Sequence, residues 1–379
     1  MANLMFKEIE LVDTAISWLQ SRLPDDWKVG RQNRHFERTS SLNPPSELNS
    51  AIEIQANDNY VKTIAIDVRL SFTPRDAENL ASRNKWTIER LAEDISVLVV
   101  TPWLSERTQD LLFKYGINYL DMAGNALIKL DNPALFLQTQ GAKRNPKPTP
   151  RGLAKVRGPK AGRLIRLLVD ISPPYGVGEI ANFTKIGAGY ISRLLDSLDR
   201  EALVERGKGG RVENVAIKGL LEKWAESYEI FRSNNSSYFV SPTGPEGTLN
   251  LLSSLPADKL VAVTGSFAAV RIAPVAAPTI LALYCQDISA VAQATDLLPA
   301  DRGANVVLLN PFDRVVYERT AVGNTNIHYV APSQAAVDCL TGNGRMPSEG
   351  TALIDWMVEN ESAWRLSSLS AAKGLASET

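Results

Sequence analysis

Few side chains in this sequence are of the types that carry out covalent or redox chemistry. Its 379 residues include only two histidines, His35 and His328, and two cysteines, Cys285 and Cys339. Two cysteines cannot form a disulfide framework or a cysteine-rich zinc site, and two histidines offer few nitrogen ligands to any metal. Both cysteines and His328 lie on apolar or strand-like segments. We therefore interpret them as packing residues and expect no histidine- or cysteine-dependent catalysis.

One triplet has an acidic and a basic residue separated by one position, which is the spacing of a metal-binding triplet in nucleases. Asp67-Val68-Arg69 ends an alternating strand pattern, and Asn49 directly precedes the strand before it. On these residues the front of the chain resembles the restriction-endonuclease-like family, whose nucleases hold Mg²⁺ with an acid at the first position and a Glu/Asp-x-Lys triplet on the next strand. Here asparagine and arginine occupy the acid and lysine positions, although Glu47 or Glu53 could supply a carboxylate. The resemblance implies a degenerate domain, from which we expect no cleavage.

A second candidate site is a Gly-Ser turn in the back of the chain. The segment LVAVTGSFAAVRIAP resembles the strand-turn-helix opening of the nucleotidyltransferase fold, in which Gly-Ser amides hold a triphosphate, and Gly265 and Ser266 fit that turn. A working transferase also needs an Asp-x-Asp pair on the neighbouring strand to hold two Mg²⁺ ions. The sequence provides only Asp287, beyond the end of that strand. We therefore expect no enzyme activity, no bound metal and no cofactor.

Positive charge is concentrated in one segment of an otherwise acidic chain. The whole chain has 41 Lys and Arg against 42 Asp and Glu. Residues 141–217 contain fifteen basic and seven acidic side chains, a net charge of +8, which leaves −9 for the rest. The stretch 141–159 is also broken by four prolines, as is typical of a solvated linker. Such a basic arm can lie on nucleic-acid phosphates, and a plain tether is the alternative.

Three helical patterns and a glycine-rich hairpin follow the linker. The helices are predicted at about 160–171, 177–183 and 188–202, and the hairpin pairs 203–206 with 211–217. A further helical pattern after the hairpin favours a core helix around Trp224 and Tyr228. On the third helix an apolar stripe at spacings of three and four leaves Tyr190, Ser192, Arg193 and Ser197 outside.

Helix, helix, short turn, helix and basic hairpin is the pattern of a winged helix-turn-helix. The segment GEIANFTKIGAGYISRLLDSLDREALVERGKGGRV resembles the winged helix of bacterial transcriptional regulators. In that fold the third helix fits the major groove and the wing reaches nearby phosphates. A protein-interaction module is the alternative, because Asp196 and Asp199 lie on the same helix. The candidate DNA-binding residues are Lys185, Tyr190, Ser192, Arg193, Arg206, Lys208, Arg211, Lys155, Arg157 and Lys160.

Length and composition indicate an ordinary folded protein of more than one domain. With 44% hydrophobic and 22% charged residues in 379, the chain can form two or three cores. It has no stretch near the ~18 apolar residues of a membrane span, and Glu8 and Glu10 interrupt any signal-peptide core, so we expect a cytoplasmic protein. The predicted fold is α/β multidomain: a degenerate restriction-endonuclease-like domain at 1–140, a basic linker at 141–159, a winged helix-turn-helix at 160–235 and a degenerate nucleotidyltransferase-like domain at 236–379.

The back of the chain adds a functional expectation. Its segment 260–357 resembles the C-terminal portion of AbiEi-type regulators, antitoxins that bind their own operator. Together these patterns predict a non-catalytic, sequence-specific regulator of transcription that binds double-stranded DNA. A homodimer is expected, because two copies double the length of the site that is read. Two alternatives stay open: a DNA nuclease delivered by the winged helix, and an antitoxin whose C-terminal domain blocks a partner toxin.

Overall fold

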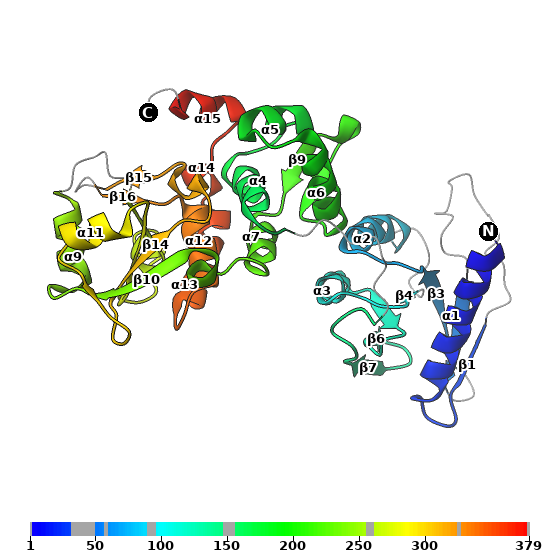
Figure 1. The fold of residues 1–379 in the computed structure, drawn as a ribbon. Helices are drawn as coiled ribbons and strands as arrows, with labels where there is room; N and C mark the ends of the chain where they lie inside the picture. Colours follow the sequence, from blue (N-terminus) through cyan, green and yellow to red (C-terminus); the bar gives the residue numbers. More distant parts are fainter. Residues whose placement is uncertain are drawn as a thin grey trace. The chain divides into compact units, whose positions relative to one another are not determined.

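The protein is a mixed α/β chain that divides into two compact units (Figure 1). A computed structural model describes residues 2–31, 50–56, 60–88, 96–146, 156–254, 261–323 and 327–376. The first unit comprises Met1–Gly152 with Arg200–Ala202, and the second comprises Leu153–Asp199 with Leu203–Thr379. The expected α/β multidomain class is confirmed at this level.

The first unit is built on a sheet of seven described strands, whose spatial order β1 to β7 follows the chain. The central strands β3, β4 and β5 are parallel and the outer pairs antiparallel. Parallel neighbours need crossover connections, which α2 and α3 provide. The elements are α1 (Ala2–Gln20), β1 (Lys28–Arg31), β2 (Ser50–Ala56), β3 (Tyr60–Val68), α2 (Pro74–Ile88), β4 (Ser96–Thr101), α3 (Glu106–Lys114), β5 (Asn118–Asp121), β6 (Ala126–Leu130) and β7 (Leu135–Thr139).

The central strands of this sheet carry a hydrophobic core on each face, since successive side chains along a strand point to opposite faces. On one face Leu98 and Val100 pack in a core with Leu19 of α1. On the other face Val99 packs in a separate core with Leu112 of α3. The carboxyl ends of β3, β4 and β5 therefore lie at one edge of a sheet with apolar layers on both sides.

Three helices and a hairpin follow, which we call the helix–hairpin segment (159–215); apart from Arg200–Ala202 it belongs to the second unit. Its elements are α4 (Pro159–Asp170), α5 (Val177–Thr184), α6 (Ala188–Arg200), β8 (Val204–Arg206), η1 (Lys208–Gly210) and β9 (Val212–Val215), followed by α7 (Ile217–Ala225) and α8 (Ile230–Ser233). The third helix ends two residues before the predicted Ala202. Ala202 instead has a left-handed φ of 53°, which turns the chain into β8.

The rest of the second unit is a sheet of seven described strands in the order β13-β10-β14-β12-β11-β16-β15. Two neighbouring pairs are parallel (β14 with β12, β11 with β16), and the other described pairs are antiparallel. The elements are β10 (Asn235–Val240), α9 (Gly244–Leu252), β11 (Val261–Thr264), α10 (Ser266–Ala269), β12 (Leu281–Cys285), α11 (Ile288–Ala294), β13 (Leu298–Pro299), β14 (Val306–Asn310), η2 (Arg314–Tyr317), β15 (Ala321–Val322), β16 (His328–Tyr329), α12 (Pro332–Leu340), α13 (Met346–Glu359), α14 (Glu361–Trp364) and α15 (Leu369–Ala376).

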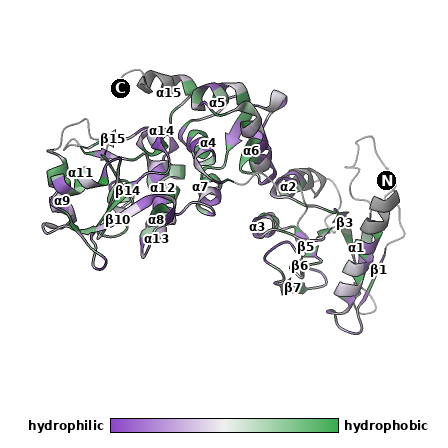
Figure 2. Ribbon diagram, viewed as in Figure 1, coloured by the Kyte–Doolittle hydropathy of each residue, from purple (hydrophilic) through white to green (hydrophobic). Residues whose placement is uncertain are grey.

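One hydrophobic core joins the helix–hairpin segment to this sheet. It contains Leu168 of α4 and Trp224 of α7 together with Tyr284 of β12 and Ala336 of α12. Figure 2 shows the hydrophobic stretches of α4 and α12 that contribute to it. Trp224 of α7 is buried, as predicted for a core helix after the hairpin; Tyr228 is buried too, but α7 ends at Ala225 and Tyr228 lies beyond it. The three helices and the hairpin therefore share their core with the C-terminal sheet.

Candidate nucleic-acid interface

Helix α6 has one buried and one exposed face. Its buried stripe is the predicted one: Ile191, Leu194, Leu195 and Leu198. Gly189, Arg193, Asp196 and Arg200 are exposed. They recur every three or four residues, so they form a single outward face. Arg200 and Asp196 were not among the predicted contact residues, although their spacing from Arg193 could have identified them.

Three side chains that were expected to face outward are partly or fully buried. Ser197 has only 6% of its surface exposed, so its predicted outward position was wrong. It lies three residues after Leu194 and therefore falls at the margin of the buried stripe. Ser192 is half-buried, and Tyr190 packs partly against the shared core. Burial raises the pKa of Tyr190 above its ordinary value.

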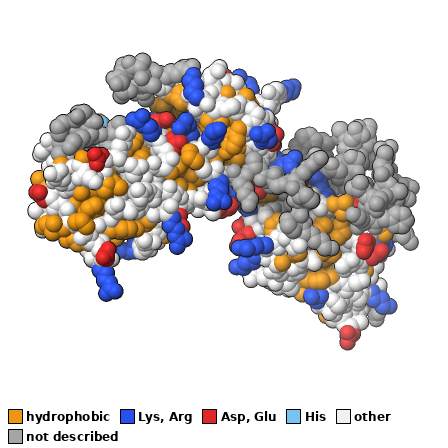
Figure 3. Space-filling view, viewed as in Figure 1, with side chains coloured by type: hydrophobic (Ala, Val, Ile, Leu, Met, Phe, Trp, Pro, Cys, Tyr) orange, Lys and Arg blue, Asp and Glu red, His pale blue; other side chains and the backbone are white. Residues whose placement is uncertain are grey.

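Several predicted cations are available to an external partner. The side chains of Arg157, Lys160, Lys185, Arg193 and Lys208 are exposed and form no hydrogen bond or ion pair with the residues that the structure describes. Lys155 lies outside the described residues. In Figure 3, Lys and Arg side chains lie on the visible surface of the second unit over the helix–hairpin segment. These uncompensated charges can attract a polyanion.

The remaining two predicted cations form ion pairs inside the segment. Arg206 pairs with Asp196 of α6 and also donates to the carbonyl oxygen of Gly210, at 3.1 Å. Arg211 pairs with Glu179 of α5 at 3.1 Å and donates to the carbonyl oxygen of Pro174. Arg206 thus links β8 to α6, and Arg211, directly before β9, links the hairpin to α5.

The hairpin turn requires glycine. Gly209 and Gly210 both have a φ of +74°, a region that side chains with a Cβ rarely adopt. The amide of Gly207 closes the turn by donating to the carbonyl oxygen of Arg211, at 2.9 Å. Lys208 lies within this turn and is exposed. The sequence therefore places a cation at the tip of a short, well-defined hairpin.

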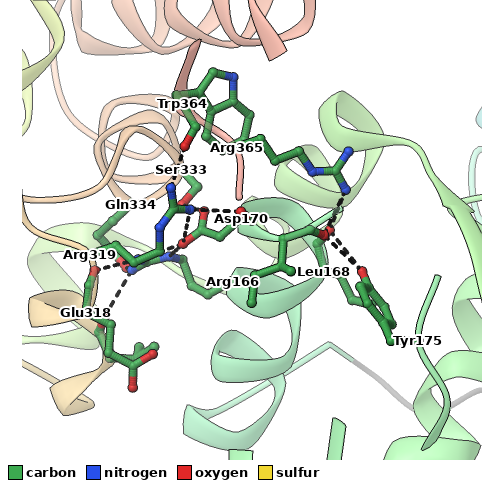
Figure 4. Close-up of polar contacts among 12 residues, drawn as sticks. Arg166, Leu168, Asp170, Tyr175, Glu318, Arg319, Ser333, Gln334, Trp364 and Arg365 are labelled. Atoms are coloured by element: carbon green, nitrogen blue, oxygen red, sulfur yellow. Dashed lines mark hydrogen bonds and ion pairs between the residues drawn. The ribbon is translucent and has the colours of Figure 1, made fainter. Parts of the chain in front are cut away.

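The C-terminal part of the second unit holds α4 through a buried guanidinium (Figure 4). Arg166 is only 2% exposed. It donates twice to Asp170, at 3.0 and 3.1 Å, and once to Gln334 of α12, at 3.0 Å. It also donates to the carbonyl oxygens of Val315 and Glu318. Arg166 belonged to the predicted basic run, but its charge is used inside the fold.

The carboxyl end of α4 is also capped by residues far away in the sequence. Arg365 donates to the carbonyl oxygens of Leu168 and Ile171, at 3.0 and 3.1 Å, and Arg319 donates to that of Asp170, at 2.9 Å (Figure 4). Guanidinium groups at this end compensate both the free carbonyls and the helix dipole. The position of α4 is therefore set by residues of the C-terminal part.

A buried carboxylate continues the polar contacts into the second sheet. Asp338 of α12 accepts hydrogen bonds from the hydroxyls of Tyr228 and Tyr284, at 2.7 and 2.9 Å, and from Thr264 and Gln334. Complete burial raises the pKa of Asp338 to about 6, although its hydrogen bonds act in the opposite direction. Gln334 also accepts from Arg166, so one network extends from α4 to β11 and β12.

In the first unit, the carboxylate of Asp67 is neutralised by the nearby side chain of Arg69. Asp67 is 1% exposed at the end of β3, and Arg69 donates to both of its carboxylate oxygens, at 2.8 and 3.0 Å. Arg69 also donates to Asp76 of α2, at 3.2 Å. Asn49 and Glu47 lie outside the described residues. A guanidinium thus occupies the oxygens that a metal ion would need.

The Gly-Ser turn of the second unit is in contact with side chains of α13. Gly265 has a φ of +62°, and the hydroxyl of Ser266 donates to the buried carboxylate of Glu349 on α13. A Cβ at Gly265 would lie 3.1 Å from the side chain of Met346, also on α13. Asp287 caps α11 by accepting from the amide of Ala290, at 2.9 Å. Helix α13 therefore places a carboxylate beside the turn to which the nucleotidyltransferase resemblance assigns a triphosphate.

The residues considered first for catalysis lie in packed surroundings. Cys285 and Cys339 are buried and unpaired, and burial raises the pKa of Cys285 to about 12. His328 is half-buried on β16. Among the described residues, no group of three or more His, Cys, Asp and Glu side chains is arranged to hold a metal ion.

No protein-family model, curated protein or solved structure matches the chain. In the described part of the chain, every helix is too short or too polar to cross a membrane.

Proposed function

We propose that the protein is a sequence-specific regulator of transcription that binds double-stranded DNA through the helix–hairpin segment, used as a winged helix-turn-helix. The observation that carries this proposal is the pattern of exposed charge on α6 and the hairpin. Arg193 on the outward face of α6, Lys185 before it and Lys208 at the hairpin tip are exposed without intramolecular partners among the described residues. Cations left uncompensated on a helix and its adjoining hairpin are suited to a groove and its flanking phosphates.

In this proposal the contacts fall into two classes. Arg193 lies on the face of α6 that enters the major groove, where arginine can donate to guanine O6 and N7. Lys185 and Lys208 contact phosphates, together with Arg157 and Lys160 at the start of α4. Tyr190 and Ser192, at the margin of the exposed face, contribute at most short-range contacts. The ion pairs of Arg206 and Arg211 orient the hairpin.

The flanking parts are proposed to be non-catalytic. The parallel centre of the first sheet fits a restriction-endonuclease-like domain, and the strand-turn-helix around Gly265 fits a nucleotidyltransferase-like one. The pairing of Asp67 with Arg69 weighs against metal binding in the first, and Glu349 beside Ser266 weighs against a phosphate in the second. These contacts favour a regulator over the nuclease alternative.

The salt dependence of duplex binding tests the proposal. If the four exposed cations assigned to phosphates each neutralise one phosphate, log K per bound copy of the chain should fall with log[salt] with a slope of roughly −3 to −4. Fluorescence anisotropy with a labelled 30-base-pair duplex at several salt concentrations measures this slope. The absence of binding at low salt, or a response that does not change with salt, would refute the proposed function.

The functional form is proposed to be a homodimer. One α6 presents few base-reading side chains and can specify only a short half-site, whereas two copies read two half-sites about one helical turn apart. Sedimentation velocity of the free protein and of its DNA complex tests this. A monomer in both states at micromolar concentration would contradict it.

A further inference from the structure

We propose that Asp196 is a base-reading residue of α6, which accepts a hydrogen bond from a cytosine amino group in the major groove and is held in position by Arg206. This inference rests on the proposed function and deepens it, because it assigns a base preference to one side chain. It also explains why an acid stands in the middle of a surface that faces a polyanion.

Asp196 points outward from α6. It lies on the exposed face of α6, three residues after Arg193 and four before Arg200, so it points in the same direction as both arginines. Its side chain is 54% exposed. If Arg193 contacts the edge of one base pair, Asp196 therefore faces a neighbouring base pair along the groove.

The negative charge of Asp196 is balanced within the protein by an ion pair. An exposed carboxylate on a DNA-binding face repels phosphates and lowers affinity, unless it is compensated or has a partner on the DNA. Here Arg206 compensates it, since its guanidinium pairs with Oδ1 of Asp196. The pair is neutral as a whole, and Arg206 is thereby withdrawn from phosphate binding. The chain uses one of its hairpin cations to keep a carboxylate on this face.

The ion pair between Arg206 and Asp196 restricts the orientation of the carboxylate. Arg206 is only 18% exposed, and its Nε also donates to the carbonyl oxygen of Gly210 at 3.1 Å, so the guanidinium cannot rotate freely. It engages Oδ1 alone, and Oδ2 has no partner among the described residues. A fixed carboxylate with one free oxygen is a directed hydrogen-bond acceptor.

The chemistry of the groove then selects the base. Cytosine presents its N4 amino group as a donor, whereas guanine and thymine present acceptors that a carboxylate repels. Adenine combines a donor with the N7 acceptor, which suits an amide better than a carboxylate. Asp196 is therefore expected to specify a C·G pair next to the pair read by Arg193.

Site selection followed by point substitution tests the inference. The full-length protein is used to enrich binding duplexes from a random library, and each base pair of the enriched site is then changed in turn. Wild type is compared with Asp196→Asn and with Glu205→Gln, a control that removes one exposed negative charge from the hairpin of the same segment. Circular dichroism and thermal melting establish that each variant is folded.

The expected result is local to one base pair. Asp196→Asn should lose about 5- to 150-fold of the discrimination at one C·G pair, with a shift toward A·T, because asparagine pairs with adenine N6 and N7. Its affinity for random duplex should rise, because the neutral pair with Arg206 is replaced by an unpaired positive charge on the same face. Glu205→Gln should also bind random duplex more tightly but keep every base preference.

Two results would overturn the inference, and they separate it from the proposed function. If Asp196→Asn changes affinity for all duplexes by the same factor, Asp196 only anchors the hairpin. If wild type binds duplex with the expected salt slope but enriches no C·G pair, the assignment to cytosine fails and DNA binding stands. Without salt-dependent binding by wild type, both fail together.

Discussion

Arg166 and Asp170 lie one turn apart on α4 and form an ion pair with an N to O distance of 3.0 Å, almost completely shielded from solvent. Every further partner of the pair comes from the C-terminal part of the chain, including Gln334, Ser333 and Arg319. A buried charge is tolerated only when its hydrogen-bonding positions are filled. The first helix of the proposed DNA-binding segment therefore depends on residues more than 140 positions away in the sequence.

Removing the guanidinium should destabilise the whole second unit. Arg166→Ala leaves Asp170 buried without its main partner, so we expect the free energy of unfolding to fall by about 3–5 kcal/mol. Because the core is shared, the helix–hairpin segment and the C-terminal sheet should still melt in one calorimetric transition. The control is Lys218→Ala, which removes the exposed ion pair of α7 with Asp355 and should cost less than about 1 kcal/mol. Equal effects of the two substitutions, or separate melting of the two parts, would contradict this view.

The stability of the second unit should also depend on the protonation of Asp338. Burial raises its pKa from 3.8 to about 6, so between these values the folded state holds the proton more tightly than the unfolded state does. The free energy of unfolding should therefore be highest below pH 4 with respect to this group and fall by about 3 kcal/mol as pH rises through 6. Urea unfolding of wild type and Asp338→Asn at pH 4 to 7 isolates this contribution. Parallel pH profiles of the two proteins would show that Asp338 does not titrate as expected.

The sequence predicted those features that depend on neighbouring residues. The spacing of Ile191, Leu194 and Leu198 gave the register of α6, and the glycines at 207, 209 and 210 gave the hairpin turn. Both signals are local, because helical periodicity and positive φ values are encoded within a few residues.

Features that depend on distant contacts were not predictable from one sequence. Arg166 stands in the basic segment 141–217, with no local sign that it is buried, yet its partner Gln334 lies 168 residues further on. Asp196 seemed to weigh against DNA binding until the hairpin brought Arg206 beside it. Neither pairing has a local periodicity, so each became visible only once the segments were folded together.

The first unit is expected to leave DNA intact. Arg69 satisfies both oxygens of Asp67, and a guanidinium stays protonated at neutral pH, so it cannot take a proton from water. Purified protein incubated with supercoiled plasmid and Mn²⁺ should give no nicked circles, and Asp67→Ala should differ only in stability, by about 1–3 kcal/mol. Nicking by wild type that disappears in Asp67→Ala would instead favour the nuclease alternative.

Base contacts and phosphate contacts should respond differently to substitution. Arg193→Ala should cost about 1–3 kcal/mol on the selected site and little on random duplex, because it removes a contact to base edges. Lys208→Ala should weaken both duplexes alike and reduce the salt slope by about 0.9, because it removes one phosphate contact. Competition binding at three salt concentrations compares the two variants. An equal loss on both duplexes for Arg193→Ala would refute the assignment of α6 to the groove.

The glycine near the start of α6 provides a test in which stability and binding should change in opposite directions. Gly189 is exposed, has no positive φ, and would bring an added Cβ within 4 Å of no other atom. Nothing inside the molecule requires glycine there, so Gly189→Ala should stabilise the protein by about 0.5–1 kcal/mol. If α6 enters the groove by this end, the extra methyl group meets DNA, and affinity for the selected site should fall. The control is Gly178→Ala, the second residue of α5, which is equally exposed and unobstructed. It should give the same gain in melting temperature with a smaller loss of affinity, since α5 crosses the backbone and α6 reads the bases. A Gly189→Ala protein that is more stable and binds its selected site as tightly as wild type would exclude a close approach of DNA to this end of α6.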